Sequence, residues 1–258
     1  MSEKRFDGRG VNELRPVSME LGFHKMAEGS VLYRAGNTVV LCTASIDDKV
    51  PPFLEGKGQG WLTAEYQMHP RSNPVRRESR DGRGKAPSGR TQEIQRLIGR
   101  ALRAAVRLDA LGERTLAIDC DVLEADGGTR TASVTGGFVA AAIALGKLLE
   151  KGAIKPGILR EAVAAVSVGL SPKGEVLLDL PYVEDRDAEV DLNLVATETG
   201  LVIEVQGTAE GAPVPRATID RMIDTALVGI QSLTTLQRRA LASHGVPSSL
   251  IAAINAAG

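Results

Sequence analysis

A chain of 258 residues that is 43% hydrophobic and 24% charged, with a net charge of −1, has the composition of an ordinary globular protein of one large or two small domains. Its first ten residues contain no apolar core of a leader peptide, and no run approaches the length of a membrane span, so we expect neither a leader nor a membrane partner. Cys42 and Cys120 both lie in apolar, strand-like runs, which excludes a disulfide scaffold and predicts a reduced, cytoplasmic setting.

The first predicted elements are a hairpin and two loops. Residues 29–45 contain two β-rich runs joined by a hairpin signal at 35–37. Residues 51–60 form a loop, and the longest loop follows at 71–89. This second loop lacks hydrophobic periodicity and is rich in arginine. Long structureless segments of compact domains are usually functional or disordered.

A helix is predicted next, because apolar residues recur at the spacing of one helical face. Thr91 is its expected N-cap. A strand over 115–123 and a second apolar helix follow, and we expect Thr131 or Ser133 to cap this helix, which ends near Gly152. The apolar face of the first helix consists of Ile94, Leu97, Ile98, Ala101, Leu102, Ala105 and Val106.

The second half of the chain repeats the order of strands followed by a helix. Hairpin signals at 171–174 and 198–200 each separate two strand-like runs, and a long helix with an apolar face follows over 219–233. This repetition predicts a duplicated α+β architecture. We divide it into a first unit over residues 1–152 and a second unit over residues 153–258.

The segment from Gly127 to Arg130 lies where a predicted strand is followed by a helix. Unpaired N–H groups and the helix dipole favour an anion at such a position. Glycines let a phosphate approach the backbone, and Arg130 adds a bidentate fork. The alternative is an ordinary left-handed turn with a surface arginine.

A second helix opens in the same way, at Ser88-Gly89-Arg90-Thr91. For Arg90 the alternative is a cap residue that faces solvent. Two such openings, each with an arginine, predict one shared phosphate site. Its candidate residues are Arg90, Gly128, Thr129 and Arg130.

The most acidic part of the chain predicts a cation site. From Asp179 to Glu210 there are nine acidic residues and one basic residue. Asp191 lies among apolar neighbours of a predicted strand, where a lone carboxylate needs a partner or a metal, and Asp185 lies nearby. Oxygen ligands without His or Cys indicate Mg²⁺ or Mn²⁺, whereas an acidic solvated turn is the alternative. Carboxylates beside a phosphate site predict phosphoryl transfer.

The most basic part of the chain predicts contact with a nucleic acid. From Arg71 to Arg114 there are twelve Lys and Arg residues against five acidic ones. The arginines of the 71–89 loop have the density expected of a contact with a nucleic-acid backbone, and a disordered basic loop is the alternative. Their place just before the predicted phosphate site favours the contact with a nucleic acid.

Several other mechanisms are excluded by missing motifs. His24, His69 and His244 are isolated and lack the spacing of metal ligands. The chain contains neither a G-x-S-x-G elbow nor a P-loop. No histidine lies near either cysteine, so both cysteines are predicted to be core residues.

Seven motifs that extend over almost the whole chain carry a resemblance to a known family. They are FDGRGVNELRP, GSVLYRAGNTVVLC, VPPFLEGKGQGWLTAEYQMHPRS, SGRTQEIQRLIGRALRA, LGERTLAIDCDVLEADGGTRTASVTGGF, EDRDAEVDLN and IEVQGTAEGA. Together they closely resemble the bacterial RNase PH family, the phosphorolytic exoribonucleases that are also called tRNA nucleotidyltransferases.

The resemblance implies a fold, a reaction and an assembly. The fold is the RNase PH fold, similar to the second domain of ribosomal protein S5, and the assembly is a hexameric ring built as a trimer of dimers. Inorganic phosphate attacks the 3′-terminal phosphodiester of tRNA precursors and other structured RNAs and releases a nucleoside diphosphate, and the reverse step adds nucleotides. A divalent cation, Mg²⁺ or Mn²⁺, assists.

The resemblance also implies the role of each candidate residue. The phosphate-binding residues are Arg90, Gly128, Thr129 and Arg130. The catalytic residues, which also hold the metal, are Asp185 and Asp191. The RNA-binding residues are Arg71, Arg76, Arg77 and Arg80.

Two other functions compete with phosphorolysis. A non-catalytic RNA-binding ring subunit of an exosome-like assembly has no need of both the arginines and the aspartates. A hydrolytic metal-dependent nuclease releases nucleoside monophosphates without added phosphate. Phosphorolysis requires the guanidinium groups of Arg90 and Arg130 to face one point beside Asp185 and Asp191.

Overall fold

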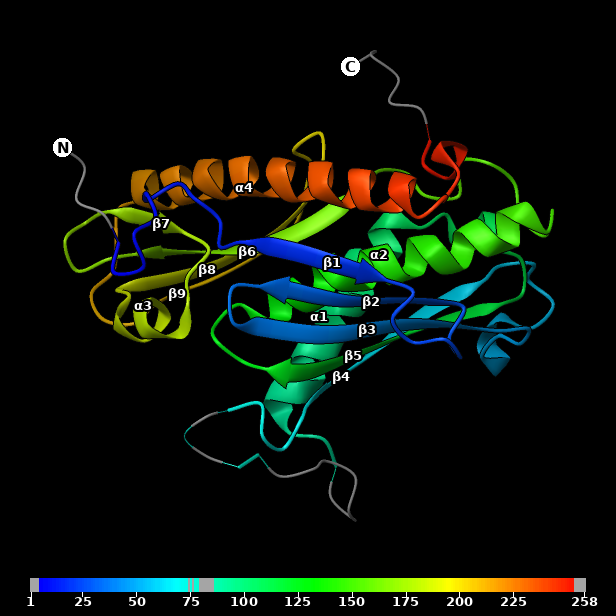
Figure 1. The fold of residues 1–258 in the computed structure, drawn as a ribbon, viewed down its shortest axis with the longest axis horizontal. Coiled ribbons are helices and arrows are strands. Elements are labelled where there is room, and N and C mark those ends of the chain that lie inside the picture. Colours follow the sequence, from blue (N-terminus) through cyan, green and yellow to red (C-terminus); the bar gives the residue numbers. More distant parts are fainter. Residues whose placement is uncertain (1–4, 74, 76, 79–85, 253–258) are drawn as a thin grey trace.

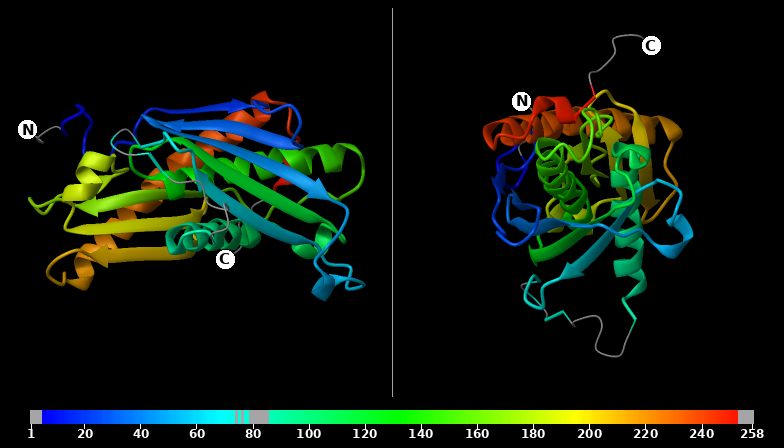
Figure 2. Two further views of the ribbon diagram at one scale, coloured as in Figure 1. Left: turned by 90° about the horizontal axis from the view of Figure 1, so that it is seen from below. Right: turned by 90° about the vertical axis from the view of Figure 1, so that its right-hand side faces the viewer.

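Two β-sheets lie beside each other in the computed structural model, which describes residues 5–73, 75, 77–78 and 86–252 (Figures 1 and 2). Among these residues the first sheet has five strands in the order β1-β2-β3-β5-β4, and the second has four in the order β7-β6-β8-β9. The strands are β1 (Val17–Leu21), β2 (Gly29–Ala35), β3 (Thr38–Asp47), β4 (Trp61–Met68), β5 (Thr115–Glu124), β6 (Val163–Leu170), β7 (Val176–Leu178), β8 (Val190–Thr197) and β9 (Val202–Ala209). The helices are α1 (Gly89–Ala105), α2 (Thr129–Glu150), α3 (Tyr182–Asp187) and α4 (Arg216–Ser243), with short 3₁₀ turns at Pro52–Leu54, Leu108–Ala110 and Ser248–Leu250.

The three predicted hairpins and the α+β class are confirmed. Strands β2 and β3, β6 and β7, and β8 and β9 each pair antiparallel across the expected turn. In the first of these turns Gly36 has a φ of 55°, a left-handed conformation that glycine adopts without steric cost.

Strands β1 and β4 were not predicted. β1 extends the first sheet by pairing with β2, and β4 pairs in parallel with β5. A parallel pair needs a long crossover, which α1 supplies between these two strands. The partner of β4 is therefore remote in the sequence, and no hairpin signal marks it.

The caps of α1 and α2 differ from the sequence-based expectation. Ser88, not Thr91, is the N-cap of α1, and its hydroxyl accepts a hydrogen bond of 3.1 Å from the Thr91 N–H. Gly128 is the N-cap of α2 and has a left-handed conformation. As a glycine it has no side chain that could accept a hydrogen bond from the first turn of the helix. Thr131 and Ser133 lie inside α2 and do not cap it. Their hydroxyls donate to the backbone carbonyls of Gly128 and Thr129.

Helix α2 lies in the core and packs against both sheets. The sequence-based statement that no run approaches the length of a membrane span is wrong for this helix, which is the one described helix long and apolar enough to cross a membrane. Its apolar residues belong to the protein core instead, since 83% of its most apolar window is buried inside the protein. Small residues permit this close packing. A Cβ atom added to Gly29 on β2 would lie 2.0 Å from the carbonyl oxygen of Ala140, and one added to Gly136 would lie 2.8 Å from the Cys42 sulfur.

The larger hydrophobic cluster extends across the predicted division of the chain. Val163 and Ala165 on β6, Val195 on β8 and Leu241 on α4 belong to the same cluster as the first sheet. A second cluster fills the space between α4 and the second sheet, where Figure 1 shows α4 lying over the strands. The division at residues 152 and 153 remains a prediction.

The close approach of β2 and α2 predicts that Gly29→Ala destabilises the protein strongly. The new methyl group would collide with a helix carbonyl rather than with a flexible side chain, so we expect the free energy of unfolding to fall by about 3 kcal/mol. Urea denaturation followed by circular dichroism measures this change.

Gly211→Ala is the matched control, because nothing lies within 4 Å of an added Cβ atom and Gly211 has no positive φ. We expect its effect to stay within about 0.5 kcal/mol. Equal stability changes in the two variants would refute the proposed packing constraint.

Candidate active site

The turn between β5 and α2, residues 126–130, has a conformation that only glycine adopts easily. Gly127 has a φ of 73° and Gly128 a φ of 65°. A Cβ atom on Gly127 would lie 2.5 Å from the carbonyl oxygen of Leu180, and one on Gly128 would lie 3.0 Å from the Arg15 guanidinium. The glycines are therefore required by contacts with the protein itself, in addition to any ligand.

This turn, which we name the phosphate turn after its predicted ligand, presents backbone N–H groups as hydrogen-bond donors. The peptide N–H groups of Gly127, Gly128, Thr129 and Arg130 donate to no acceptor among the described residues. They lie at the N-terminus of a helix of 22 residues, whose dipole adds positive potential. Such a group of N–H donors is suited to an oxyanion.

Arg90 and Arg130 reach the same surroundings from different helices. Arg90 is exposed at the start of α1, and Arg130 is half-buried at the start of α2. Burial raises the pKa of the Tyr66 hydroxyl, whereas its hydrogen bond with Thr129 and the charges of Arg90 and Arg130 oppose this rise. Both guanidinium groups therefore lie within electrostatic range of one buried hydroxyl.

Two aspartates lie near these arginines: Asp185 on α3, and Asp191 on β8 of the second sheet. Burial raises the pKa of Asp185, and the charges of Arg130 and Arg90 oppose it. Burial also raises the pKa of Asp191 to about 6, with a further increase from Asp185 and an opposing effect of Arg130. The structure thus brings together the four side chains on which the sequence analysis depends, while their roles remain predictions.

Three side chains that the sequence analysis did not single out orient these groups. Gln206 on β9 accepts a hydrogen bond of 3.0 Å from Arg130 and donates one of 3.0 Å to Glu93. Glu93 forms an ion pair of 3.5 Å with Arg130. Asn193 donates to both carboxylate oxygens of Asp191, at 3.3 and 3.2 Å.

Tyr66 is a fourth such residue, and its hydroxyl lies 2.9 Å from the Thr129 hydroxyl. The alternation of β4 puts Tyr66 on the buried side of the sheet, which a sequence-based prediction of that strand would have indicated. Gln206 carries no comparable local signal, because its partners Arg130 and Glu93 lie on other elements. Asn193 lies two residues after Asp191 on β8, so the alternation of a strand would have placed the two side chains on one face.

The donor set beside Arg130 suits a metal that keeps several of its own waters. No group of three or more His, Cys, Asp or Glu side chains able to hold a metal occurs within the described ranges. Asp185 and Asp191 supply two carboxylates. Mg²⁺ is characteristically bound by one or two carboxylates together with substrate phosphates, rather than by a closed protein cage. The residues present therefore fit Mg²⁺ or Mn²⁺ and a phosphorylated ligand.

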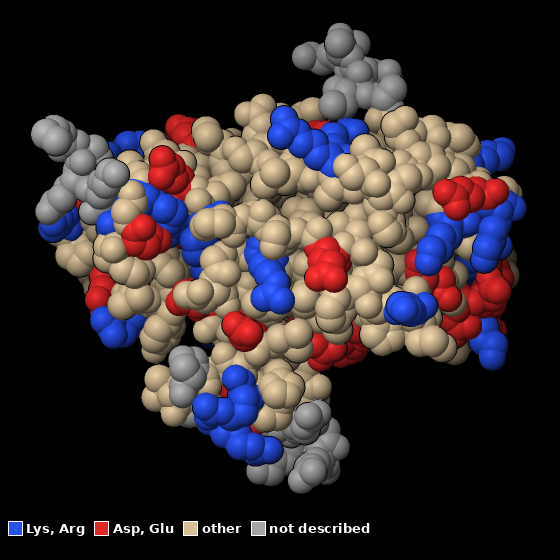
Figure 3. Space-filling model, in the orientation of Figure 1, with Lys and Arg blue, Asp and Glu red and all other residues tan. Residues whose placement is uncertain are grey.

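The arginine-rich segment follows β4 in the chain, and its first residues, 71–73, lie beyond the end of that strand (Figure 1). Figure 3 shows a group of Lys and Arg side chains at the lower edge of the molecule. Arg71 and Arg77 are exposed, whereas Arg76 and Arg80 lie outside the described residues.

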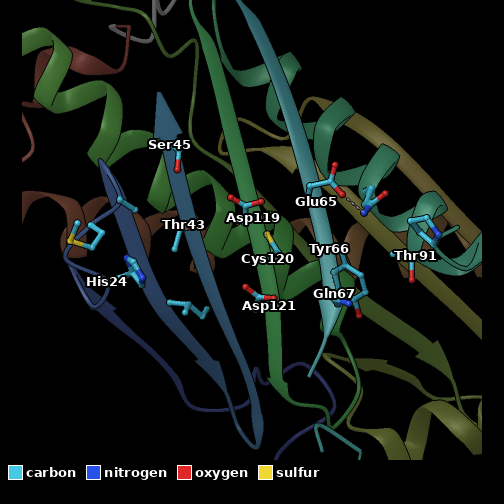
Figure 4. Close-up of a pocket in the computed structure, with 15 residues that line it drawn as sticks. His24, Thr43, Ser45, Glu65, Tyr66, Gln67, Thr91, Asp119, Cys120 and Asp121 are labelled. Atoms are coloured by element: carbon cyan, nitrogen blue, oxygen red, sulfur yellow. Dashed lines mark hydrogen bonds between the residues drawn. The ribbon is translucent and has the colours of Figure 1, made fainter. Parts of the chain in front are cut away.

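An open cavity of about 660 Å³ lies on the outer face of the first sheet. Figure 4 shows Glu65, Asp119 and Asp121 pointing into it from β4 and β5. Burial raises the pKa of Asp119, and Asp121 adds to the effect. This acidic cavity shares Tyr66 with the candidate active site, but Arg90, Arg130, Asp185 and Asp191 do not line it.

Comparison with known proteins identifies two matching family models. Residues 13–145 match domain 1 of the 3′ exoribonuclease family, and residues 161–229 match domain 2. A protein named ribonuclease PH from Geobacillus sp. (strain WCH70) is 54% identical over 92% of this chain and 92% of its own. One of the same name from Bacillus subtilis (strain 168) is 53% identical over 92% of this chain and 96% of its own.

Solved structures share the fold at low sequence identity. Rice (Oryza sativa) Rrp46 has a TM-score of 0.75 and is 18% identical, over 92% of this chain and 100% of its own. An Archaeoglobus fulgidus exosome with RNA bound to the active site has a TM-score of 0.74 and is 20% identical, over 90% of this chain and 92% of its own.

The raised pKa of Asp191 predicts that Asp191→Asn stabilises the metal-free protein. A carboxyl whose pKa is higher in the folded than in the unfolded chain destabilises the fold above that pKa, and this cost disappears as the pH falls through about 6 towards 4. Asp185 and Glu210 raise this pKa, and Arg130 and Asn193 lower it. We expect a gain of about 1–2 kcal/mol in the free energy of unfolding at pH 7.5 in EDTA, and none at pH 4.

Asp187→Asn is the control, since Asp187 is exposed and paired with Arg186 on the same helix. Urea denaturation at the two pH values measures both variants. A destabilised Asp191→Asn protein at pH 7.5 would show that the carboxylate is not held under electrostatic strain.

Proposed function

The chain belongs to the RNase PH family of 3′ exoribonucleases, and we propose that Arg90, Arg130, Asp185 and Asp191 form its active site. The protein is a phosphorolytic 3′-to-5′ exoribonuclease, a nucleotidyltransferase that removes 3′-terminal nucleotides from tRNA precursors and other RNAs. Inorganic phosphate is its co-substrate, nucleoside diphosphates are its products, and the reverse reaction adds nucleotides to an RNA 3′ end.

The observation that supports the assignment of the site is electrostatic proximity beside the start of α2: Asp185 lies within range of the charges of Arg90 and Arg130, and Asp191 within range of those of Asp185 and Arg130. Phosphate is already an oxyanion at neutral pH, so the reaction needs orientation and charge compensation rather than a strong base. The guanidinium groups of Arg90 and Arg130 and the free N–H groups of the phosphate turn hold and orient the nucleophile. Gln206 and Glu93 keep Arg130 in place.

The bond changes follow from this orientation. A phosphate oxygen attacks the phosphorus of the 3′-terminal phosphodiester, and the bond from that phosphorus to the 3′ oxygen of the preceding nucleotide breaks. The released 3′ oxygen takes a proton from solvent. Asp185 and Asp191 would hold Mg²⁺ or Mn²⁺, which when bound supplies positive charge for the phosphoryl oxygens.

The arginine-rich segment is our candidate for the RNA-binding surface. Arg71 and Arg77 are exposed on it, and Arg76 and Arg80, which lie outside the described residues, belong to the same stretch of sequence. Contacts of arginine with phosphates are independent of base sequence and weaken as salt displaces them. They would hold the body of a structured RNA while its 3′ end enters the active site.

We also propose that the chain assembles as a homohexameric ring, a trimer of dimers. Strand β9 forms an edge of the second sheet and carries exposed apolar side chains, with Val202 50% and Val205 44% exposed. Leu201, just before this strand, is 63% exposed. An exposed apolar edge of this kind is suited to pairing with another subunit.

A cytoplasmic location is consistent with the cysteines. Cys42 and Cys120 are both free and buried, and they face each other in register on β3 and β5. Adjacent thiols that remain reduced are typical of proteins in a reducing compartment.

Product analysis tests the proposed function. The purified protein with Mg²⁺, a tRNA precursor and phosphate should release nucleoside diphosphates, and without phosphate it should release nothing. Asp191→Asn should lower the turnover at least 100-fold and leave the affinity for RNA, measured by filter binding, within about threefold, because the carboxylate acts on the reacting phosphate.

Other products would select another function. Nucleoside monophosphates formed without phosphate would indicate a hydrolytic nuclease. RNA binding without any product would indicate a non-catalytic ring subunit. Lost RNA binding in a folded Asp191→Asn protein would contradict the assignment of Asp191.

Phosphate is expected to stabilise the native protein, because it compensates the charges of Arg90 and Arg130. A ligand that binds only the native state at 100 times its Kd adds about 2.7 kcal/mol. For a chain of this size each kcal/mol raises Tm by about 2–4 °C, so thermal unfolding should shift by several degrees. Potassium chloride at equal ionic strength is the control, and the Arg130→Gln variant should lose most of the shift. An equal shift with both salts would remove the support for an anion site.

A further inference from the structure

Arg15 forms a buried ion pair with Asp179 below the phosphate turn. Both residues are 5% exposed. The Arg15 guanidinium donates hydrogen bonds of 3.0 and 2.6 Å to the two carboxylate oxygens of Asp179, and the Arg15 backbone N–H donates a third of 2.8 Å. A bidentate pair of this kind fixes geometry as well as charge.

The remaining nitrogen of Arg15 holds the phosphate turn itself. It donates a hydrogen bond of 2.6 Å to the carbonyl oxygen of Asp126. Thr38 holds the next peptide, since its hydroxyl donates to the carbonyl of Gly127 at 2.7 Å and accepts from the N–H of Asp126 at 3.0 Å. Two consecutive carbonyl groups of the turn are thus bound from inside the protein.

These bonds determine where the N–H groups of the turn point. In a trans peptide the C=O and the N–H point in opposite directions. Because the carbonyls of Asp126 and Gly127 are directed at Arg15 and Thr38, the N–H groups of Gly127 and Gly128 point away from them. These N–H groups are among those that find no acceptor in the described part of the chain.

Asp179 connects the same pair to the aspartate side of the active site. It lies three residues before α3, and its φ of 56° is a left-handed conformation that a non-glycine residue adopts at a cost. Its N–H donates to the carbonyl of Ser167 at 2.7 Å. The first N–H of α3, at Tyr182, donates to the Asp126 side chain at 3.2 Å. The start of α3 and the phosphate turn are therefore linked on two sides.

We propose that Arg15 and Asp179 are positioning residues that hold the phosphate turn against α3 and so set the place of the bound phosphate relative to Asp185. This inference rests on the proposed function. Neither residue touches the reacting atoms. Arg15 acts through main-chain groups that would orient the nucleophile, so its loss should weaken phosphate binding without weakening the contact with RNA.

A lysine cannot replace Arg15 in this role. One ammonium group lacks the planar fork that binds Asp179 with two nitrogens and the Asp126 carbonyl with a third. Arg15→Lys keeps the buried positive charge and removes this geometry. Asp179→Asn keeps the shape of the partner and removes its charge.

The test compares Arg15→Lys and Asp179→Asn with Arg238→Lys. Arg238 binds Glu198 with two nitrogens, each at 2.5 Å, and ties α4 to the β8–β9 hairpin away from the active site. Steady-state kinetics with varied phosphate and varied RNA give the two KM values. Thermal unfolding with and without phosphate, in the absence of RNA, measures phosphate binding independently of activity.

We expect both site variants to raise KM for phosphate at least tenfold, to leave KM for RNA within twofold, and to lose most of the phosphate-dependent rise in Tm. Arg238→Lys should lower Tm and leave both KM values within twofold. Thr38→Val keeps the ion pair and removes the hydrogen bonds of the Thr38 hydroxyl to the Gly127 carbonyl and the Asp126 N–H, so it should raise KM for phosphate about threefold. It replaces the first two variants if they do not fold.

Unchanged KM for phosphate in the folded variants, or an equal rise of both KM values, overturns the inference. A wild-type protein that forms no nucleoside diphosphate would overturn the proposed function instead. In that case the loss of the phosphate-dependent Tm shift in Arg15→Lys would still support the role of Arg15, and its retention would refute it.

Discussion

The burial of α2 between the two sheets is the constraint on which the rest of the structure depends. Gly29 permits β2 to approach the helix backbone, and Gly136 admits the Cys42 side chain. Because the helix is packed along most of its length, its N-terminus has one position, at the end of β5. That position is where α1, α3 and β8 also deliver charged side chains. The proposed active site is thus positioned by core packing rather than by the charges it contains.

The proposed active site holds carboxylates of like charge close together. Burial raises the pKa of both Asp185 and Asp191, and the charge of Asp185 adds to the rise at Asp191. Arg130 opposes both shifts and Arg90 opposes that of Asp185, but the pKa of each carboxyl stays raised. The protein tolerates this arrangement because the network around it is satisfied, with Gln206 and Glu93 on Arg130 and Asn193 on Asp191. The uncompensated charges of the arginines and aspartates lower the stability of the free protein. Binding of an anion and a cation at the site would relieve this electrostatic cost, which favours their binding.

Much of the fold could be predicted from the sequence, because hairpins and amphipathic helices are indicated by patterns of residues that are close together in the chain. The turns at Gly36, Gly174 and Gly200 and the apolar face of α1 needed no knowledge of remote contacts. Strand β4 was missed since its parallel partner follows a whole helix. The N-caps were misplaced because cap geometry depends on the backbone angles of Ser88 and Gly128, which the residue types alone do not set.

The sequence by itself pointed to the residues that we propose as the active site: the arginine and glycine residues at the start of two helices, and the aspartates at 185 and 191. Only the tertiary structure decided that these residues lie near one another, and that Tyr66, Gln206 and the Arg15–Asp179 pair lie around them. The physical reason is the separation along the sequence of the residues that interact. Turn and helix signals arise from neighbours a few residues apart, whereas an ion pair between positions 15 and 179 exists only once packing has brought two distant segments of the chain into contact.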